Sequence, residues 1–143
     1  MPKMPKNMPR VGAVVLLRDD GAALLQLRDA KPSLRNAGLW VPPGGHAEPG
    51  EAIEACARRE FYEETDYRCG QLHWLCTFED RVEGFPPYAL TVFWSRYDGQ
   101  QRVACREGQA LEFVRREEAG GRAMPPYLKQ LWNDAYAQAF KLN

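Results

Sequence analysis

The sequence predicts a single mixed α/β domain, and three observations support this fold class. Short apolar runs, some of them rich in β-branched or aromatic residues, alternate with turn residues and predict β-strands. Two longer segments without internal glycine or proline predict helices. The chain of 143 residues has the length of one domain and shows no repeat or low-complexity linker.

The predicted strands follow a short start that contains several prolines. Residues 1–10 hold three prolines and three basic residues but no apolar run, so we expect a flexible tail ahead of a domain over residues 11–143. The first two strands flank Asp19-Asp20-Gly21, a sequence typical of a hairpin turn. The six predicted strands cover residues 11–18, 22–28, 39–41, 72–78, 89–97 and 110–114.

The remaining segments predict two helices and two irregular stretches. The helices cover residues 51–65 and 125–140, and the second has one apolar face. That face consists of Leu128, Leu131, Trp132, Ala135 and Ala139. No regular element is expected to continue through the two prolines and two glycines of residues 42–45. The glycine and prolines within residues 79–88 predict an exposed loop.

The composition is that of a soluble globular protein with balanced charge. Basic and acidic residues number 19 each, so the formal net charge is zero and gives no strong signal for nucleic-acid or membrane binding. No apolar run is long enough to span a bilayer, and we expect a cytoplasmic protein. The cysteines show neither a C-x-x-C pair nor zinc-type spacing, so we expect reduced, buried thiols at Cys56, Cys69, Cys76 and Cys105.

The first predicted helix carries carboxylates on the side expected to face the core. At 100° per residue, Glu60, Glu63 and Glu64 continue the wedge that begins with Ile53 and Cys56. Like charges at this spacing repel by about 3 kcal/mol at an effective dielectric of ~20. The helix alone leaves two interpretations open: a solvated acidic face, or a site for a hard divalent cation.

The residues around this helix resemble the signature of the Nudix family, G-x5-E-x7-R-E-U-x-E-E-x-G-U, in which U is a bulky apolar residue. Gly45 is followed at the required spacing by Glu51 and then by residues 59–67, which supply the arginine and three further glutamates. Residues 40–45 are similar to the family's W-x-x-P-G-G segment. Two positions depart from the pattern, because Asp66 replaces a glycine and Tyr67 an aliphatic residue. We expect Asp66 to take the left-handed conformation that ends the helix.

The resemblance implies a Nudix fold, with a mixed β-sheet between helices (α/β/α), and metal-dependent cleavage of a diphosphate linkage. The cofactor it implies is Mg²⁺, with Mn²⁺ as a substitute. The implied metal ligands are Glu60, Glu64 and Glu63, with the carbonyl of Gly45, and Glu107 as a further candidate. The implied catalytic residues are Glu63, Glu60, Arg59 and Glu51, of which Arg59 orients neighbouring glutamates, whereas an ordinary surface ion pair is the alternative for it.

Candidates for contacting the substrate lie outside the signature. Arg28 ends the second predicted strand and could meet a phosphate or have a structural role. The aromatic residues Trp40, Phe85 and Tyr88 could stack on a base or pack in the core. The general base stays open among Glu60, Glu63, Glu79, Asp80 and Glu83.

Three functions are compatible with this signature. The first is hydrolysis of a nucleoside diphosphate joined to another group, in a nucleotide sugar, a dinucleotide or a nucleoside triphosphate. The second is a non-catalytic domain that senses a nucleotide or binds a partner, although such domains typically lose signature glutamates. The third is removal of diphosphate from an RNA 5′ end, which the balanced charge does not favour. A homodimer is also possible.

Overall fold

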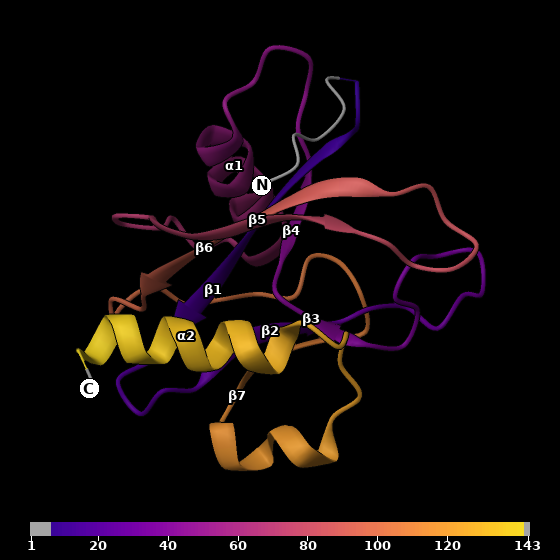
Figure 1. Ribbon diagram of the computed structural model, residues 1–143. Coiled ribbons are helices and arrows are strands. Elements are labelled where there is room, and N and C mark those ends of the chain that lie inside the picture. The colour runs from indigo at the N-terminus through magenta and orange to yellow at the C-terminus, as the bar shows by residue number, and fades with distance from the viewer. Residues whose placement is uncertain (1–6, 142–143) are drawn as a thin grey trace.

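A seven-stranded mixed sheet forms the centre of the computed structural model, which describes residues 7–141 (Figure 1). Most of the expected tail, residues 1–6, lies outside the described residues, and Arg10 is the first residue of a strand. The strands are β1 (Arg10–Leu17), β2 (Ala23–Leu27), β3 (Trp40–Val41), β4 (Gly44–His46), β5 (His73–Asp80), β6 (Tyr88–Arg96) and β7 (Ala110–Val114). The helices are α1 (Ile53–Thr65), the 3-10 helix η1 (Arg116–Gly121) and α2 (Leu128–Phe140).

Strand β1 is the central strand of the sheet. It pairs antiparallel with β2 and β4 and parallel with β6, in the order β3-β2-β1-β6-β5, while β7 pairs with β2. The predicted hairpin between β1 and β2 is confirmed, and Gly21 in its turn has a φ of 85° that favours glycine. The segments that precede and follow the signature helix are therefore brought together around one strand.

The two long helices cover opposite faces of the sheet (Figure 1). Val14 and Leu16 of β1 belong to the apolar cluster that includes Phe61 of α1. The alternate residues Val15 and Leu17 pack in the cluster that includes Trp132 of α2. This arrangement confirms the predicted sheet between helices and explains why β1 is an uninterrupted apolar run.

One strand was missed and one prediction about the cysteines was wrong in part. Strand β3 ends at Val41, so no element continues through the two prolines, but Gly44 and Gly45 begin the new strand β4. In it Gly45 pairs with Gly12 and Gly44 with Ala13 of β1. A Cβ on Gly44 would overlap the carbonyl of Gly12, so glycine permits this close strand pairing. Buried thiols were expected throughout, but Cys76 is only partly buried, and Cys105 is exposed because it lies on an irregular segment outside the core.

The remaining features concern the helices. The helices begin at Ile53 and Leu128, two or three residues later than predicted, and η1 was not foreseen. Asp66 has a φ of 64° and ends α1, as expected. Within residues 7–141, none of the helices has the length and apolar character needed to cross a bilayer.

Candidate active site

Glu64 is the most deeply buried carboxylate of α1. It is 4% exposed, and its Oε1 accepts a hydrogen bond of 2.8 Å from the side-chain amide of Gln26 on β2. Its second oxygen, Oε2, is also buried and has no hydrogen-bond partner among the described residues. Burial raises the pKa of Glu64 to about 9, the nearby carboxyl of Glu107 adds to this effect, and the Gln26 amide opposes it. The site therefore contains a buried oxygen that lacks a donor or a cation.

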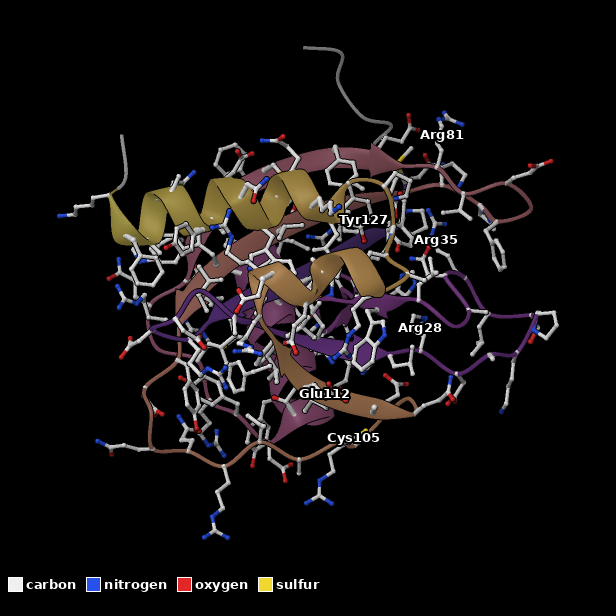
Figure 2. The ribbon with its side chains drawn as sticks, turned by 90° about the horizontal axis from the view of Figure 1, so that it is seen from below. Arg28, Arg35, Arg81, Cys105, Glu112 and Tyr127 are labelled. Atoms are coloured by element: carbon white, nitrogen blue, oxygen red, sulfur yellow. The ribbon has the colours of Figure 1, made fainter. Side chains whose placement is uncertain are left out.

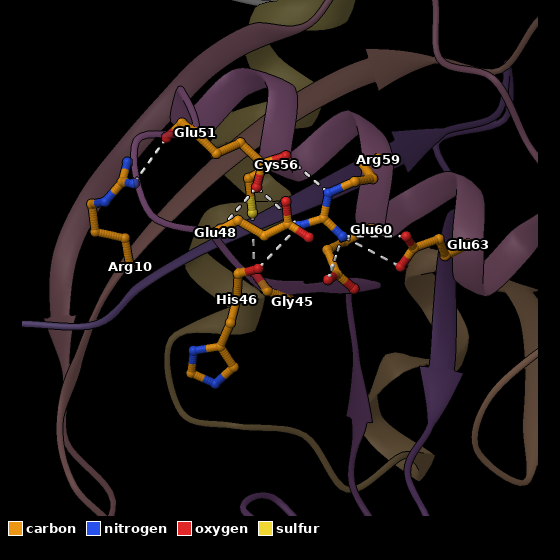
Figure 3. A network of polar contacts seen from close by, with 9 residues as sticks. All are labelled: Arg10, Gly45, His46, Glu48, Glu51, Cys56, Arg59, Glu60 and Glu63. Carbon is orange, nitrogen blue, oxygen red and sulfur yellow. Dashed lines mark hydrogen bonds and ion pairs between the residues drawn. The ribbon is translucent and has the colours of Figure 1, made fainter.

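Arg59 binds the other three signature glutamates (Figure 3). Its Nε and Nη2 donate to the two oxygens of Glu51 at 2.8 and 2.9 Å, which is the bidentate geometry that suits arginine. Its Nη1 lies 2.9 Å from Glu60 and 3.2 Å from Glu63. The arginine holds the pKa of Glu51 low, at about 2, with help from the backbone N–H of Glu48. Arg59 thus reduces the repulsion that the sequence pattern implied.

The three glutamates expected on the core side of α1 do not all face the core. Glu64 is buried and Glu60 is partly buried, but the side chain of Glu63 is 54% exposed. Glu63 lies four residues after Arg59 and turns outward to meet its guanidinium group. The prediction was right for Glu60 and Glu64 and wrong for Glu63.

Gly45 lies directly against the Glu60 carboxylate. A Cβ at this position would overlap the Glu60 carboxylate, so a larger residue would displace the end of that side chain. The Gly45 carbonyl accepts a hydrogen bond from the Cys56 thiol at 3.3 Å, and the Arg59 Nη2 reaches the next carbonyl, that of His46, at 3.2 Å (Figure 3). The first signature glycine and glutamate Glu60 therefore share one corner of the site.

Glu107 approaches the site from the segment before β7. The backbone N–H groups of Ala104 and Arg106 donate to the carbonyls of Thr65 and Glu64, at 2.9 and 3.0 Å, and hold this segment against the end of α1. Glu107 is exposed, and its carboxyl helps to raise the pKa of the buried Glu64. The structure brings together Glu107 and the signature residues, which lie more than forty positions apart in the sequence.

The carboxylate and carbonyl oxygens of this site suit a hard divalent cation, although the described side chains are not arranged around a single ion position. Carboxylate and carbonyl oxygens are the preferred ligands of Mg²⁺, and the unpartnered Glu64 Oε2 provides one that no protein group uses. No group of three or more His, Cys, Asp or Glu side chains within residues 7–141 is already placed to hold an ion. Glu60 is turned toward Arg59, and Glu64 toward Gln26, so holding an ion would require these carboxylates to turn toward one another.

A pocket of about 160 Å³ opens beside this corner. Gly45 and Gln26 form part of its wall, and Arg28, Arg35 and Tyr88 lie farther along it. No acidic residue lines the pocket, so it offers a cationic surface directly next to the carboxylates. Figure 2 shows Arg28 and Arg35 near each other on the same side of the molecule. We call this space the polar pocket.

The four predicted substrate residues lie in different places. Arg28 lines the polar pocket, and its Nε donates to the carbonyl of Arg35 at 2.8 Å. Tyr88 also lines it, whereas Phe85 lines a neighbouring hollow. Trp40 is not brought to either space, because it is 8% exposed within the core and Arg122 covers its ring at 4.6 Å.

Three residues of the site were not singled out from the sequence. Gln26 holds Glu64, Arg35 crosses between two loops, and Tyr127 lines the polar pocket from just before α2. Gln26 carries a usable signal, since it is a polar residue inside an apolar strand and is 1% exposed. Arg35 stands in an irregular segment without periodicity, and Tyr127, although inside the predicted second helix, lies just before its observed start.

Comparisons with known proteins agree with this fold. The family model for the NUDIX domain matches residues 6–137. "Putative nudix hydrolase 1" of Caenorhabditis elegans is 39% identical over 90 residues, which cover 62% of this chain and 24% of that protein. The asymmetrical bis(5′-nucleosyl)-tetraphosphatase of Sus scrofa is 33% identical over 93 residues, which cover 56% of this chain and 58% of that protein. The chain thus aligns with only part of each of these curated relatives.

A solved structure extends the match over almost the whole length. The MutT protein of Methanosarcina mazei Go1 superimposes with a TM-score of 0.77 at 21% identity, covering 97% of this chain and 99% of that one. At this identity the likeness demonstrates the shared fold. The family match over most of the sequence shows that the chain belongs to the Nudix family.

Proposed function

We propose that the chain hydrolyses the diphosphate linkage of a nucleoside diphosphate joined to another group, with Mg²⁺ or Mn²⁺ as cofactor. The substrate class includes nucleotide sugars, dinucleotides and nucleoside triphosphates. The activity named for the Sus scrofa relative supports including dinucleoside polyphosphates in this class. The four unpaired thiols are compatible with action in the cytoplasm.

One observation carries the proposal: the buried Glu64 oxygen without a partner, next to Glu60 and beside the cationic polar pocket. An unpaired buried oxygen costs stability unless a ligand satisfies it. Asp80 pairs with Arg35, but Arg28 has no ion pair with an acidic side chain among the described residues, so Arg28 gives the pocket a positive charge that suits an anionic substrate. The two features together favour a cation and a phosphate chain bound side by side.

The residues of the chain then take distinct parts in the reaction. Glu60 and Glu64 would hold the cation, with Glu63, the Gly45 carbonyl and Glu107 as further oxygen donors. A bound cation supplies charge neutralisation of the diphosphate and a lower pKa for water. Arg59, anchored on Glu51, keeps Glu60 and Glu63 close to the site. The Nε of Arg28 donates to the carbonyl of Arg35, which leaves its terminal amino groups for a phosphate.

Glu63 is the best placed of the five carboxylates considered as the general base. It is exposed and borders the site, so it can receive a proton from water. Glu79 pairs with Arg81 at 2.9 Å, and Asp80 is buried against Arg35. Glu83 lies exposed in the loop after β5, and no contact links it to the signature residues. These placements favour Glu63 without a role for the loop carboxylates.

The test is a hydrolysis screen of a nucleotide sugar, a dinucleoside polyphosphate and the nucleoside triphosphates, with products identified by mass spectrometry. Activity on at least one compound should depend on added Mg²⁺ or Mn²⁺ and disappear with chelator. Absence of hydrolysis across the panel, with nucleotide binding retained, would favour the non-catalytic sensing domain instead.

A further inference from the structure

The segment that carries Glu107 is anchored at both ends. Residues 104–109, which we call the Glu107 loop, cross from the last turn of α1 to the end of β2. Two backbone hydrogen bonds hold the first half of the loop on α1. At β2 the backbone N–H of Gln109 donates to the carbonyl of Leu27, and its side-chain amide donates to the carbonyl of Arg28, both at 2.8 Å. Glu107 therefore lies between the signature helix and the end of β2.

The loop turns sharply after Glu107. Gly108 has a φ of 82°, and a Cβ there would overlap the carbonyl of Leu27, so glycine lets the loop turn directly against β2. The thiol of Cys105, labelled in Figure 2, donates to the carbonyl of Glu107 at 3.3 Å. These contacts hold the backbone of Glu107, while its exposed side chain lines one hollow together with Gln26.

An ion pair adds a further link between the Glu107 loop and α1. The Nε and Nη2 of Arg106, the residue before Glu107, donate to Oδ2 of Asp66 at 3.0 and 2.7 Å. Asp66 ends α1 with a φ of 64°, at the position where the Nudix signature has glycine. A glycine would end the helix without strain but would offer Arg106 no acceptor. The departure from the signature thus creates the link.

Stability alone gives little reason for this pair. Its two side chains are 59% and 38% exposed, and exposed ion pairs contribute little to the stability of a fold. The left-handed conformation also costs an aspartate more than a glycine. The pair does, however, fix the residue directly before Glu107, whose carboxyl helps to raise the pKa of the buried Glu64.

We propose that Asp66 and Arg106 are positioning residues that hold the Glu107 carboxylate within reach of the bound cation. This role rests on the proposed function and refines it, because the place of one metal ligand then depends on a residue that the signature lacks. A carboxylate that is held beside the site in advance loses less freedom when the ion binds. Neither residue of the pair contacts the ion in this role.

Binding of Mg²⁺ alone, measured by isothermal titration calorimetry, tests this role without any substrate. We expect Asp66→Gly and Arg106→Ala each to raise the Kd for Mg²⁺ by about tenfold, the lower end of what loss of a group supporting a metal ligand costs. The two substitutions remove opposite charges, so a simple charge effect would raise the Kd in Asp66→Gly and lower it in Arg106→Ala. A rise in both therefore reports position and not charge.

Two further variants locate the effect. Glu107→Gln should itself weaken Mg²⁺ binding, and adding Arg106→Ala to it should cause no further loss, because the pair acts through Glu107. The matched control is Arg18→Ala, which removes an arginine from another exposed pair, with Asp20 at 2.8 Å in the β1–β2 hairpin, and should leave the Kd unchanged. A further loss in the double variant, or an equal loss in the control, contradicts the proposal.

The melting temperature in chelator separates positioning from a role in the fold. Asp66→Gly loses the pair but accepts the left-handed conformation without strain, so its melting temperature without metal should stay close to that of the wild type. A lower melting temperature with an unchanged Kd for Mg²⁺ would mean that the pair only supports the fold, and it would overturn the proposal. Opposite changes of the Kd in Asp66→Gly and Arg106→Ala would overturn it as well.

The outcomes distinguish this inference from the proposed function. Mg²⁺-dependent hydrolysis of a compound in the screen, with an unchanged Kd in both variants, contradicts the positioning role alone. The expected rise in both Kd values without hydrolysis of any compound contradicts the proposed function and supports the positioning role. Absence of Mg²⁺ binding to the wild type contradicts both.

Discussion

Two arginines, Arg59 and Arg35, differ in how completely their donors are used. Arg59 directs all three of its guanidinium nitrogens to acceptors, namely Glu51, Glu60, Glu63 and the carbonyl of His46. Arg35 is more deeply buried, yet within residues 7–141 its Nε has no acceptor and Oδ2 of its partner Asp80 has no donor. The Arg59 network holds the signature glutamates in position, whereas Arg35 connects the segment before β3 to the loop between β5 and β6.

Replacement of the buried Glu64 should have the largest effect on turnover. Glu64→Gln keeps the size and the helix propensity but removes the charge that would hold the cation. Loss of a residue that only supports a metal ligand costs about 10–100-fold, so loss of a ligand itself should exceed that range. Turnover in the hydrolysis assay should fall accordingly, while circular dichroism stays unchanged.

The control for this variant lies on the same helix. Glu54→Gln changes an exposed glutamate that pairs with Arg58 at 3.5 Å, and it should retain full activity. If Glu64→Gln kept half of the wild-type turnover, Glu64 would not hold the metal.

Replacing the buried Arg35 should cost more stability than replacing an exposed arginine. Arg35→Ala leaves Asp80, 8% exposed, without its charged partner, and breaking such a buried pair costs about 3–5 kcal/mol. Urea denaturation should show this loss in the free energy of unfolding. The exposed pair of Arg81 and Glu79 offers the comparison, because Arg81→Ala should cost less than about 1 kcal/mol. Equal losses in the two variants would mean that the Arg35 pair is not buried in solution.

Arg59 should matter for turnover through the groups that it positions. Arg59→Lys keeps the charge but cannot bind Glu51 in the bidentate manner, so we expect a decrease in kcat of about 10–100-fold. Arg58→Lys, on the neighbouring position, serves as the control because the polar partners of Arg58 within residues 7–141 are Glu54 and the carbonyls of Cys69 and Gly70. An unchanged kcat in Arg59→Lys would mean that Arg59 forms an ordinary surface ion pair and has no part in turnover.

The same contrast explains how much could be predicted from the sequence. The Arg59 network lies on one helix and one adjacent turn, so fixed spacing revealed it. Glu63 was misplaced because the buried face of α1 centres on Ala57 and Phe61, which leaves Glu63 outside it, where it pairs with Arg59. The Arg35 cluster joins residues 35, 80, 86 and 88 from separate segments, and no local period connects them. Strand β4 was missed because a Gly-Gly pair usually interrupts a strand, whereas here it permits close packing.

The pH dependence of stability should report the environment of Glu64. Its folded-state pKa of about 9 lies above the ordinary value of 4.5, so the metal-free folded state binds this proton more tightly than the unfolded state. This contribution to stability is fully present below the ordinary pKa and is lost as pH rises through the folded-state value. Urea denaturation in chelator should therefore show declining stability from about pH 5 to about pH 9, and Glu64→Gln should flatten the decline. An equal decline in the variant would assign it to other groups.

The central claim is that Glu64 forms part of a cation site, and the melting temperature with and without Mg²⁺ tests it most directly. A cation that binds only the folded state at a hundredfold excess over its Kd stabilises by about 2.7 kcal/mol, which raises the melting temperature by several degrees. We predict this shift for the wild type. Glu64→Gln does not titrate and resembles the protonated residue, so near neutral pH it should melt no lower than the metal-free wild type and respond little to Mg²⁺. A full Mg²⁺ response in Glu64→Gln would contradict the account and place the cation elsewhere.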